Sequence, residues 1–577
     1  MAKKIIISII IVIIAIALIT TILIIALKKN NKEIFTGKID DWKYNPRKYN
    51  IDYNTGINYS STATKNAESI DGNIGFSTGG AKDINNFREN ITNGYFPIST
   101  DITYNGLFYD YTFDTGNKGE SDQLFSPSYS CAISKDPISN NDEYYMTVGL
   151  NSNIKESDFQ RKKLNLVVVL DISGSMSSEF SSYYYDAVLG KNEEDLKSDD
   201  DNKTKMEIAN ESVNILIDNL NEDDRFGMVL FDDSSYLAKP IRKISETDTN
   251  AIKKHILDIQ PQGGTNFEAG YTEATELFEE YKKSDKDEYE NRIIVITDAM
   301  PNAGTTSKKG LLSYVRENAN DGIHTTFIGV GVDFNTELIE EISDVRGANY
   351  YSVHNSNEFK ERMGEQFEYM VTPLVFDLSL DFKSNNYQIE TVYGSDTANK
   401  ENGNIMKVNT LFPSKTTEDG EVKGGVILLK LKKLDNNESD KIELKVSYKD
   451  RNGKDYNNMQ TVNFEKNDEY YDNIGIRKAI VLTRYANALK NWILYERTED
   501  KKFIIVPNIG ITDCIYTEDE IENLLGENER TSVELKVSDE YKETFKKIKG
   551  YIERENENIK DENLNQEIKI LNKLIEN

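Results

Sequence analysis

The sequence contains few cysteines and few histidines, and both shortages exclude classes of protein. Only 2 cysteines occur in 577 residues, and Cys131 and Cys514 lie too far apart to form a metal-binding motif. We expect two buried or free thiols, with one long-range disulfide as the open alternative. The 3 histidines are scattered and no His-Glu-x-x-His motif occurs, so a zinc metalloprotease of that type is not supported.

Positive charge is also in short supply. The chain has 69 Lys+Arg against 98 Asp+Glu, which gives a formal net charge of -29 at pH 7. Because nucleic-acid binding requires a basic surface, we expect no nucleic-acid partner. No Gly-x-x-x-x-Gly-Lys-Ser/Thr motif occurs, so the sequence does not indicate a P-loop ATPase.

One long apolar run stands at the start of the chain. Residues 5–27 carry no charge and are mostly Ile, Leu, Val and Ala, and about 20 such residues span a bilayer as a helix. A cleaved signal peptide is the alternative, because Ala15-Ile16-Ala17 resembles a cleavage site. The run continues well past Ala17, which favours an uncleaved transmembrane anchor at 1–29. Lysines flank both ends of the apolar run, so the positive-inside rule does not decide the orientation of the helix. We expect a single-pass cell-membrane protein with a cytoplasmic N-terminus and an extracytoplasmic body.

The rest of the chain divides into five regions by composition and periodicity. Residues 474–498 have the apolar pattern of one long helix, and Ser538–Asn577 that of a helical hairpin. We expect a polar tether at 30–60, a β-rich N-terminal domain at 61–160, an α/β domain at 161–373, a β-sandwich at 374–466 and a helical C-terminal region at 467–577.

Residues 161–373 alternate apolar runs with helical patterns, which predicts an α/β fold with a doubly wound, mostly parallel sheet. An acidic insertion at 179–202 follows the first strand. It is either a solvated loop, or a partner-contact loop or second cation site. The last helix is expected at Glu358–Met370. Strands are expected at Leu164–Asp171, Arg225–Phe231, Arg292–Thr297, Thr325–Val330 and Ala348–Val353.

The first of these strands ends in oxygen-bearing side chains. Val167–Met176 reads Val-Val-Val-Leu-Asp-Ile-Ser-Gly-Ser-Met, so Asp171, Ser173 and Ser175 alternate directly after a buried strand. In open α/β sheets, ligands bind at the carboxyl ends of the strands. A carboxylate and two hydroxyls placed there suit a hard divalent cation such as Mg²⁺. The alternative is that Asp and Ser only cap the next helix.

Two later segments favour the metal interpretation. Gln262-Gly263-Gly264-Thr265-Asn266 presents a hydroxyl after a tight glycine loop, although helix capping would also account for Thr265. The strand Ile293–Thr297 again ends in a carboxylate, Asp298. If this strand lies beside the first one, the three loops bring five side chains to one place: Asp171, Ser173, Ser175, Thr265 and Asp298.

These three segments resemble the metal-ion-dependent adhesion site (MIDAS) of von Willebrand factor type A domains, and the likeness covers about 161–373. One departure is Ala299, where the family often has glycine. The resemblance implies that one coordination position of the ion stays open for a carboxylate of a partner. It also implies hydroxyl ligands at Ser173, Ser175 and Thr265, and carboxylates at Asp171 and Asp298 that act largely through water, around Mg²⁺ or alternatively Mn²⁺ or Ca²⁺.

A wider likeness joins residues from about 70 to 498 to bacterial membrane-anchored proteins that carry this domain. It rests on Gly79–Asp83, Thr100–Tyr104 and Lys478–Tyr485. The group is similar in architecture, and its function is poorly defined, so this likeness adds little about mechanism.

The resemblance implies an extracytoplasmic adhesion or protein–protein interaction protein and not an enzyme. Its partner would be a protein that offers an acidic side chain. One alternative is an assembly factor for an ATPase or another complex. Another is a metal-dependent hydrolase, which needs a general base near the ion; Glu268 is the only candidate close to the three loops. A linked hypothesis is that the helix Glu358–Met370 shifts when a ligand binds.

Overall fold

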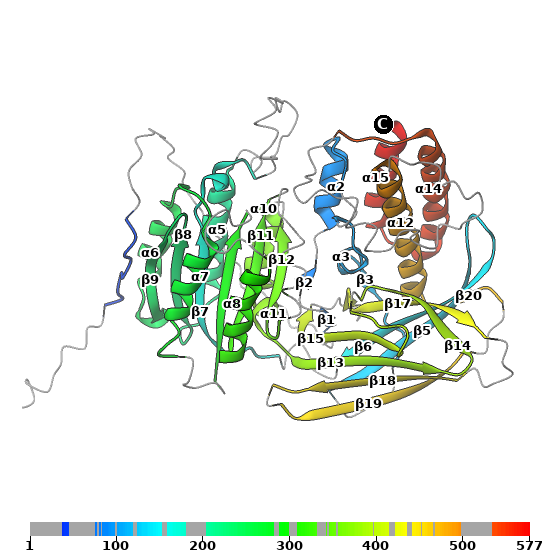
Figure 1. Cartoon of the computed structure of the whole chain (residues 1–577), viewed down its shortest axis with the longest axis horizontal. Coiled ribbons are helices and arrows are strands. Elements are labelled where there is room, and N and C mark those ends of the chain that lie inside the picture. Colours follow the sequence, from blue (N-terminus) through cyan, green and yellow to red (C-terminus); the bar gives the residue numbers. More distant parts are fainter. Residues whose placement is uncertain are drawn as a thin grey trace, which may run out of the picture.

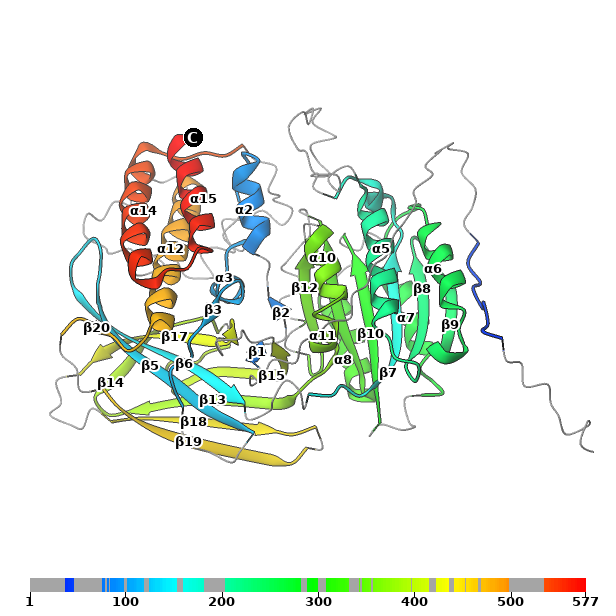
Figure 2. The ribbon, with the colours of Figure 1, turned by 180° about the vertical axis from the view of Figure 1, so that it is seen from behind.

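The computed structural model has three parts: an α/β domain, a β-sandwich and a layer of helices (Figure 1). The view from behind shows the α/β domain at one end and the helices packed over the sandwich at the other (Figure 2). The structure describes residues 37–45, 75–180, 203–497 and 534–577. Within these ranges it leaves out 78–79, 82–83, 98–100, 119–123, 153–158, 282–287, 299–307, 332–341, 343–344, 354–355, 396, 415–421, 435–440, 452 and 465–467.

Several predicted features lie outside the described residues. They include the anchor at 1–29, most of the tether at 30–60, nearly all of the insertion at 179–202, and Cys514. Among the residues that are described, no helix is long and apolar enough to cross a membrane. The anchor and the pairing state of Cys514 therefore stay predictions.

The α/β domain is built on one sheet of seven strands in the order β2-β12-β11-β10-β7-β8-β9. Neighbouring strands are parallel except at the edge, where β9 runs antiparallel to β8. This is the predicted doubly wound, mostly parallel arrangement. The strands are β2 (Gly80–Ala81), β7 (Lys163–Asp171), β8 (Arg225–Phe231), β9 (Ser235–Lys243), β10 (Tyr289–Thr297), β11 (Ile323–Val330) and β12 (Asn349–Val353).

The β7 strand is buried on both faces, which explains its continuous aliphatic sequence. Val168 and Leu170 pack into one core with α5, α6 and α10, whereas Val167 and Val169 pack into a second core with α7 and α8. Full burial of each such side chain stabilises the fold by about 1.5–3 kcal/mol. The helices are α5 (Lys205–Asp218), α6 (Thr249–Leu257), α7 (Phe267–Glu276), α8 (Lys308–Asp321) and α10 (Ser356–Met363).

The last predicted helix of this domain, Glu358–Met370, is interrupted. It consists of α10 and a separate α11 (Phe367–Val371). The break follows Met363 at Gly364, whose N–H donates to the carbonyl of Lys360 at 2.9 Å as the helix ends. Glycine is a poor helix residue, and the prediction of one continuous helix was wrong for this reason.

The sandwich combines strands from two stretches that we predicted to be separate domains, 61–160 and 374–466, and adds the short strand β20 from the predicted helical region 467–577. Its two sheets enclose one core, and Ile427 lies opposite Val148 across the antiparallel pair of β17 and β6. One sheet has the order β14 (Tyr387–Tyr393), β17 (Val426–Lys433), β6 (Asp142–Ser152), β5 (Phe125–Lys135) and β20 (Tyr470–Tyr471). The other has the order β1 (Gly75–Ser77), β15 (Asn404–Ser414), β13 (Val375–Ser384), β18 (Lys441–Lys449) and β19 (Asp455–Asn463).

The helical layer packs against the outer face of the sheet that contains β5 and β6. Its centre is α12 (Ile474–Arg497), which is buried along almost its whole length. Arg484 of α12 pairs with Glu143 of β6 at 2.9 Å, so the layer is fastened to the sandwich by charge as well as by apolar contact. The other helices are α2 (Ile84–Thr92), α3 (Tyr104–Tyr109), α14 (Asp539–Ile559) and α15 (Leu564–Glu576).

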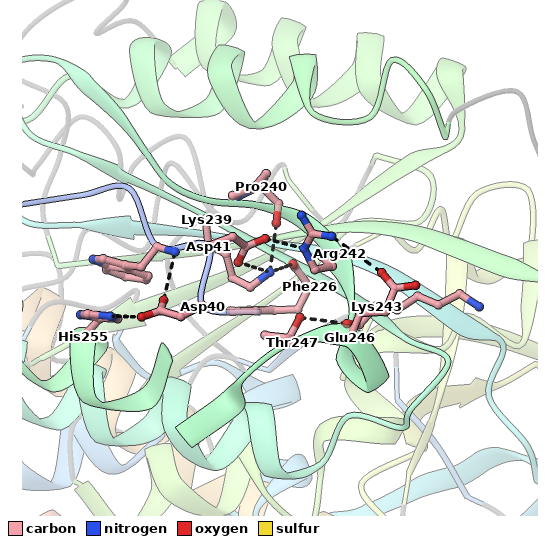
Figure 3. A network of polar contacts seen from close by, with 11 residues as sticks. Asp40, Asp41, Phe226, Lys239, Pro240, Arg242, Lys243, Glu246, Thr247 and His255 are labelled. Atoms are coloured by element: carbon pink, nitrogen blue, oxygen red, sulfur yellow. Dashed lines mark hydrogen bonds and ion pairs between the residues drawn. The ribbon is translucent and has the colours of Figure 1, made fainter. Parts of the chain in front are cut away.

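Residues 37–45, which we call the strap, lie against the β9 edge of the α/β domain (Figure 3). The N–H of Lys43 donates to the carbonyl of Ala238 at 2.8 Å, and the Asp41 carboxylate pairs with Lys239 of β9 at 3.3 Å. Trp42 stacks on His255 of α6, with ring centroids 5.5 Å apart. Part of the predicted tether is thus folded onto the domain, which the polar composition of 30–60 did not indicate.

Candidate metal site

The carboxyl ends of β7 and β10 lie side by side, as the metal interpretation requires. Leu170 is paired with Ile296 in the parallel register, so Asp171 lies next to Thr297. The hydroxyl of Thr297 donates to Asp171 Oδ2 at 2.5 Å, and the N–H of Ser173 donates to Asp171 Oδ1 at 2.8 Å. The Asp171 side chain, fully buried, is therefore held from both sides at the end of its strand.

The two serines connect Asp171's loop to Asp298. Ser173 Oγ lies 3.0 Å from Ser175 Oγ, and Ser175 Oγ donates to Asp298 Oδ1 at 2.8 Å. Ser173 and Asp298 are buried, whereas Ser175 is only partly buried and Gly174 is exposed. The group therefore opens to solvent at Ser175, where a ligand can approach.

The loop that carries Thr265 lies against the same group. The N–H of Gly174 donates to the carbonyl of Gly263 at 3.0 Å, and Gly263 has φ +69°, a conformation that favours glycine. Thr265 itself is 2% exposed. All five predicted site residues thus lie at one end of the sheet, Asp171 as the last residue of β7 and the others on loops. Hydrogen bonds between side chains join three of them directly: Ser173, Ser175 and Asp298.

Helix capping accounts neither for the serines after β7 nor for Thr265. The short 3₁₀ turn Gly174–Ser177 has Ser173 at its N-cap position without a side-chain capping bond. The helix α7 is capped by Asn266, whose side chain accepts from the N–H of Ala269 at 3.2 Å, and not by Thr265. Helix capping is therefore not the role of these polar side chains, and they are arranged as candidate ligands.

The electrostatics of the group favour a bound cation. Burial raises the pKa of Asp171 to about 7, and the nearby Asp298 carboxylate pushes it in the same direction against the hydrogen bonds from Thr297 and Ser173. Two buried carboxylates that repel each other are stabilised by a positive ion between them. Hydroxyl and carboxylate oxygens are ligands that Mg²⁺ accepts, so this donor set fits a hard dication.

A cluster of three or more His, Cys, Asp or Glu side chains that could bind a metal is not found in the described part of the chain. The site has two carboxylates, and its remaining candidate donors are hydroxyls. Of the histidines that are described, His255 pairs with Asp40 and His324 with Glu290, away from the three loops. Glu268, the candidate general base, accepts a hydrogen bond from the hydroxyl of Tyr314.

Three contributors to the site were missed from the sequence. Thr297 fixes Asp171, and Lys205 donates to Asp298 Oδ2 at 2.9 Å. Asp232, directly after β8, accepts from the side-chain amide of Gln262 at 2.8 Å and so positions the glycine loop. A third strand that ends in a carboxylate was the available signal for Asp232; nothing in the sequence marks Lys205, because a lysine at the start of a helix is ordinarily exposed.

Comparison with known proteins identifies the type of domain. Residues 166–301 match the von Willebrand factor type A domain model. The chain is similar to inter-alpha-trypsin inhibitor heavy chain H4 of Bos taurus, 24% identical over 225 residues, which is 38% of this chain and 22% of that protein. It is similar to the uncharacterized protein YfbK of Escherichia coli (strain K12), 24% identical over 226 residues, which is 38% of this chain and 34% of that protein.

Among solved structures, the chain is similar to the von Willebrand factor type A protein from Catenulispora acidiphila, with 15% identity, a TM-score of 0.37, and coverage of 64% of this chain and 81% of that chain. The chain spans between about a fifth and a third of the length of the two curated relatives. The family match confirms the predicted von Willebrand factor type A domain within the α/β region. It leaves the ion, the membrane anchor and the partner as predictions.

Proposed function

We propose that this protein is a membrane-anchored, extracytoplasmic adhesion or interaction protein that binds an acidic side chain of a protein partner through a divalent cation. The observation that carries the proposal is the group of Asp171, Ser173, Ser175 and Asp298, buried except at Ser175, at the ends of adjacent parallel strands. Helix capping does not account for these side chains, and their oxygens suit Mg²⁺. The ion would supply Lewis acidity toward a ligand carboxylate.

The residues of this chain would divide the roles. Ser173, Ser175 and Thr265 would offer hydroxyl oxygens to Mg²⁺, or to Mn²⁺ or Ca²⁺. Asp171 and Asp298 would balance the charge of the ion, largely through water. The partial exposure of Ser175 beside exposed Gly174 supports access for the partner from that side.

A binding role is favoured over hydrolysis because the described candidates for a general base are engaged in other contacts. Glu268 already accepts a hydrogen bond from Tyr314, and the described histidines are paired elsewhere. The second candidate, an assembly factor for an ATPase or another complex, uses the same cation and differs in its location. Protease shaving of intact cells separates them, because only an extracytoplasmic body is cleaved.

Mg²⁺ titration of the full-length protein in detergent tests the cation. We expect one saturable site that EDTA reverses and that Asp171→Asn weakens by about 10–100-fold, since one of two balancing charges is lost. Partner binding that persists in excess EDTA would contradict the proposed use of the ion.

A further inference from the structure

The candidate metal site contains a buried lysine that the known ligand pattern does not explain. Lys205 is the first residue of α5, and Thr204 precedes it as a capping box with Glu207. Its side chain is 1% exposed, and its ammonium group pairs with Asp298 Oδ2 at 2.9 Å. Asp298 is equally buried, so this ion pair lies inside the protein.

Asp298 is shared between two donors. Its Oδ1 accepts from Ser175, which belongs to the metal loop, whereas its Oδ2 accepts from Lys205. The lysine therefore contacts the carboxylate oxygen of Asp298 that does not accept from Ser175. An ion bound by the serines and Asp298 would have the positive charge of Lys205 close by.

The backbone provides a fitted place for this lysine. Gly331, directly after β11, has φ +94°, and its N–H donates to the carbonyl of Val353 at 2.8 Å. A Cβ at position 331 would lie 2.6 Å from Lys205 Cε, so a larger residue there would require the lysine side chain to shift. The backbone N–H of Lys205 donates to the carbonyl of Ser178 at 2.9 Å. The lysine is thus packed in place and does not merely fold back from the surface.

The charges of the group give this lysine a role. The two negative charges of Asp171 and Asp298 cancel the two positive charges of a bound dication, and the neutral hydroxyls contribute no charge. Lys205 then leaves one positive charge in the loaded site, and one carboxylate of a partner neutralises it. Buried like charges a few ångströms apart repel one another substantially, so the same lysine weakens the hold on the ion.

We propose that Lys205 is a positioning residue that sets the charge of the loaded site: it lowers affinity for the divalent cation and raises affinity for a carboxylate ligand. This inference rests on the proposed cation-mediated function. It adds that selectivity for an anionic ligand comes from a residue outside the three metal loops.

The test uses Mn²⁺ as the metal probe and acetate as the carboxylate probe, with the full-length protein in detergent. Electron paramagnetic resonance gives the Mn²⁺ affinity, and water-proton relaxation follows the displacement of Mn²⁺-bound water by acetate. For Lys205→Met we expect Mn²⁺ affinity to rise about tenfold and acetate affinity of the loaded site to fall about tenfold, because one nearby positive charge is lost.

Lys239→Met is the matched control. It makes the same change at another buried lysine of the same domain, one that pairs with Asp41 of the strap, and both affinities should stay at their wild-type values. If Lys205→Met folds poorly, Lys205→Gln removes the same charge while keeping a hydrogen-bond donor, and the same two shifts are expected.

The outcomes separate this inference from the proposed function. Wild-type protein that binds no Mn²⁺ would overturn both. Wild-type protein that binds Mn²⁺, with equal acetate affinity in the wild type and both Lys205 variants, would overturn the role of Lys205 alone. Thermal unfolding in EDTA supplies a readout without metal: a merely structural lysine would lower the melting temperature in its variants without moving either affinity.

Discussion

Two buried lysines of the α/β domain, Lys205 and Lys239, each pair with an aspartate, and their surroundings differ. Lys239 donates to the carbonyls of Phe226 and Pro240 at 3.0 and 3.1 Å, in addition to its ion pair with Asp41 (Figure 3). Lys205 pairs with a carboxylate that also faces the metal loop. The same residue type therefore fastens a chain segment at one edge of the sheet and adjusts the charge of a candidate site at its carboxyl end.

Burial alone does not distinguish these roles. Both lysine side chains are almost completely inaccessible, at 1% and 0% exposure. What differs is the second neighbour of the aspartate. Asp41 is shared with Arg242 at 2.7 Å, another cation, whereas Asp298 is shared with Ser175, a neutral candidate ligand. The group that shares the aspartate, and not the burial of the lysine, therefore distinguishes the two sites.

The largest change in the free energy of unfolding is expected when Lys205 loses its partner, Asp298. Asp298→Ala leaves a buried, uncompensated ammonium group, and we expect a loss of about 3–5 kcal/mol in the free energy of unfolding. Divalent cation binding should disappear as well. Urea unfolding in EDTA and Mg²⁺ titration measure the two effects, with Asp298→Asn as the control that retains the shape of the side chain. If Asp298→Ala bound Mg²⁺ with the affinity of the wild type, Asp298 would not be a ligand of the ion.

The second-largest effect is the pH dependence that Lys239 confers on the free energy of unfolding. Burial lowers the pKa of Lys239 from 10.5 to about 8, although Asp41 opposes the change. Between pH 8 and 10.5 the unfolded chain thus holds a proton that the folded chain has released, so the free energy of unfolding rises with pH in this window. We expect wild type to gain about 2–3 kcal/mol relative to Lys239→Met across the window. Parallel pH curves for the two proteins would contradict this.

A smaller effect is expected from Lys239→Met at neutral pH. The variant leaves the carbonyls of Phe226 and Pro240 without the lysine donor, which costs about 1–2 kcal/mol. Asp41 keeps its ion pair with Arg242, which limits the damage. Hydrogen exchange should accelerate at residues 37–45 while Mg²⁺ affinity stays unchanged. A change in Mg²⁺ affinity would mean that the two lysines are coupled.

The smallest effect is expected at the surface of the strap. Trp42 stacks on His255 with an interplanar angle of 9°, and such aromatic contacts contribute about 0.5–1.5 kcal/mol. Trp42→Ala should loosen the strap by about this amount, measured again by hydrogen exchange at 37–45. Exchange equal to that of the wild type would show that the stack of Trp42 on His255 does not help to hold the strap.

Local sequence patterns predicted the α/β domain well, because each strand and helix carries its own periodicity. The metal interpretation required the strand ends at Asp171 and Asp298 to be neighbours, and the register of β7 and β10 places them side by side. Pairing between distant strands has no such local signal. The union of β6 with β17 in one sheet was therefore missed, as was the docking of the strap on β9.

The candidate site likewise has parts with a local sequence signal and parts without one. Its oxygen-bearing side chains follow strands or glycines and were visible in the sequence. The side chain of Lys205 packs closely against Gly331, which lies far along the chain and has φ +94°. Such a contact arises only when the sheet is assembled, so it could not be predicted from either residue alone.

The most direct test of this account is calorimetric titration of the full-length protein with Mg²⁺, beside Asp171→Asn and with Lys239→Met as a folded control. We expect one EDTA-sensitive site per chain in the wild type and in Lys239→Met, and a loss of affinity of about 10–100-fold in Asp171→Asn. Equal affinity in all three proteins, or no Mg²⁺ binding by the wild type, would contradict a cation site at the ends of β7 and β10.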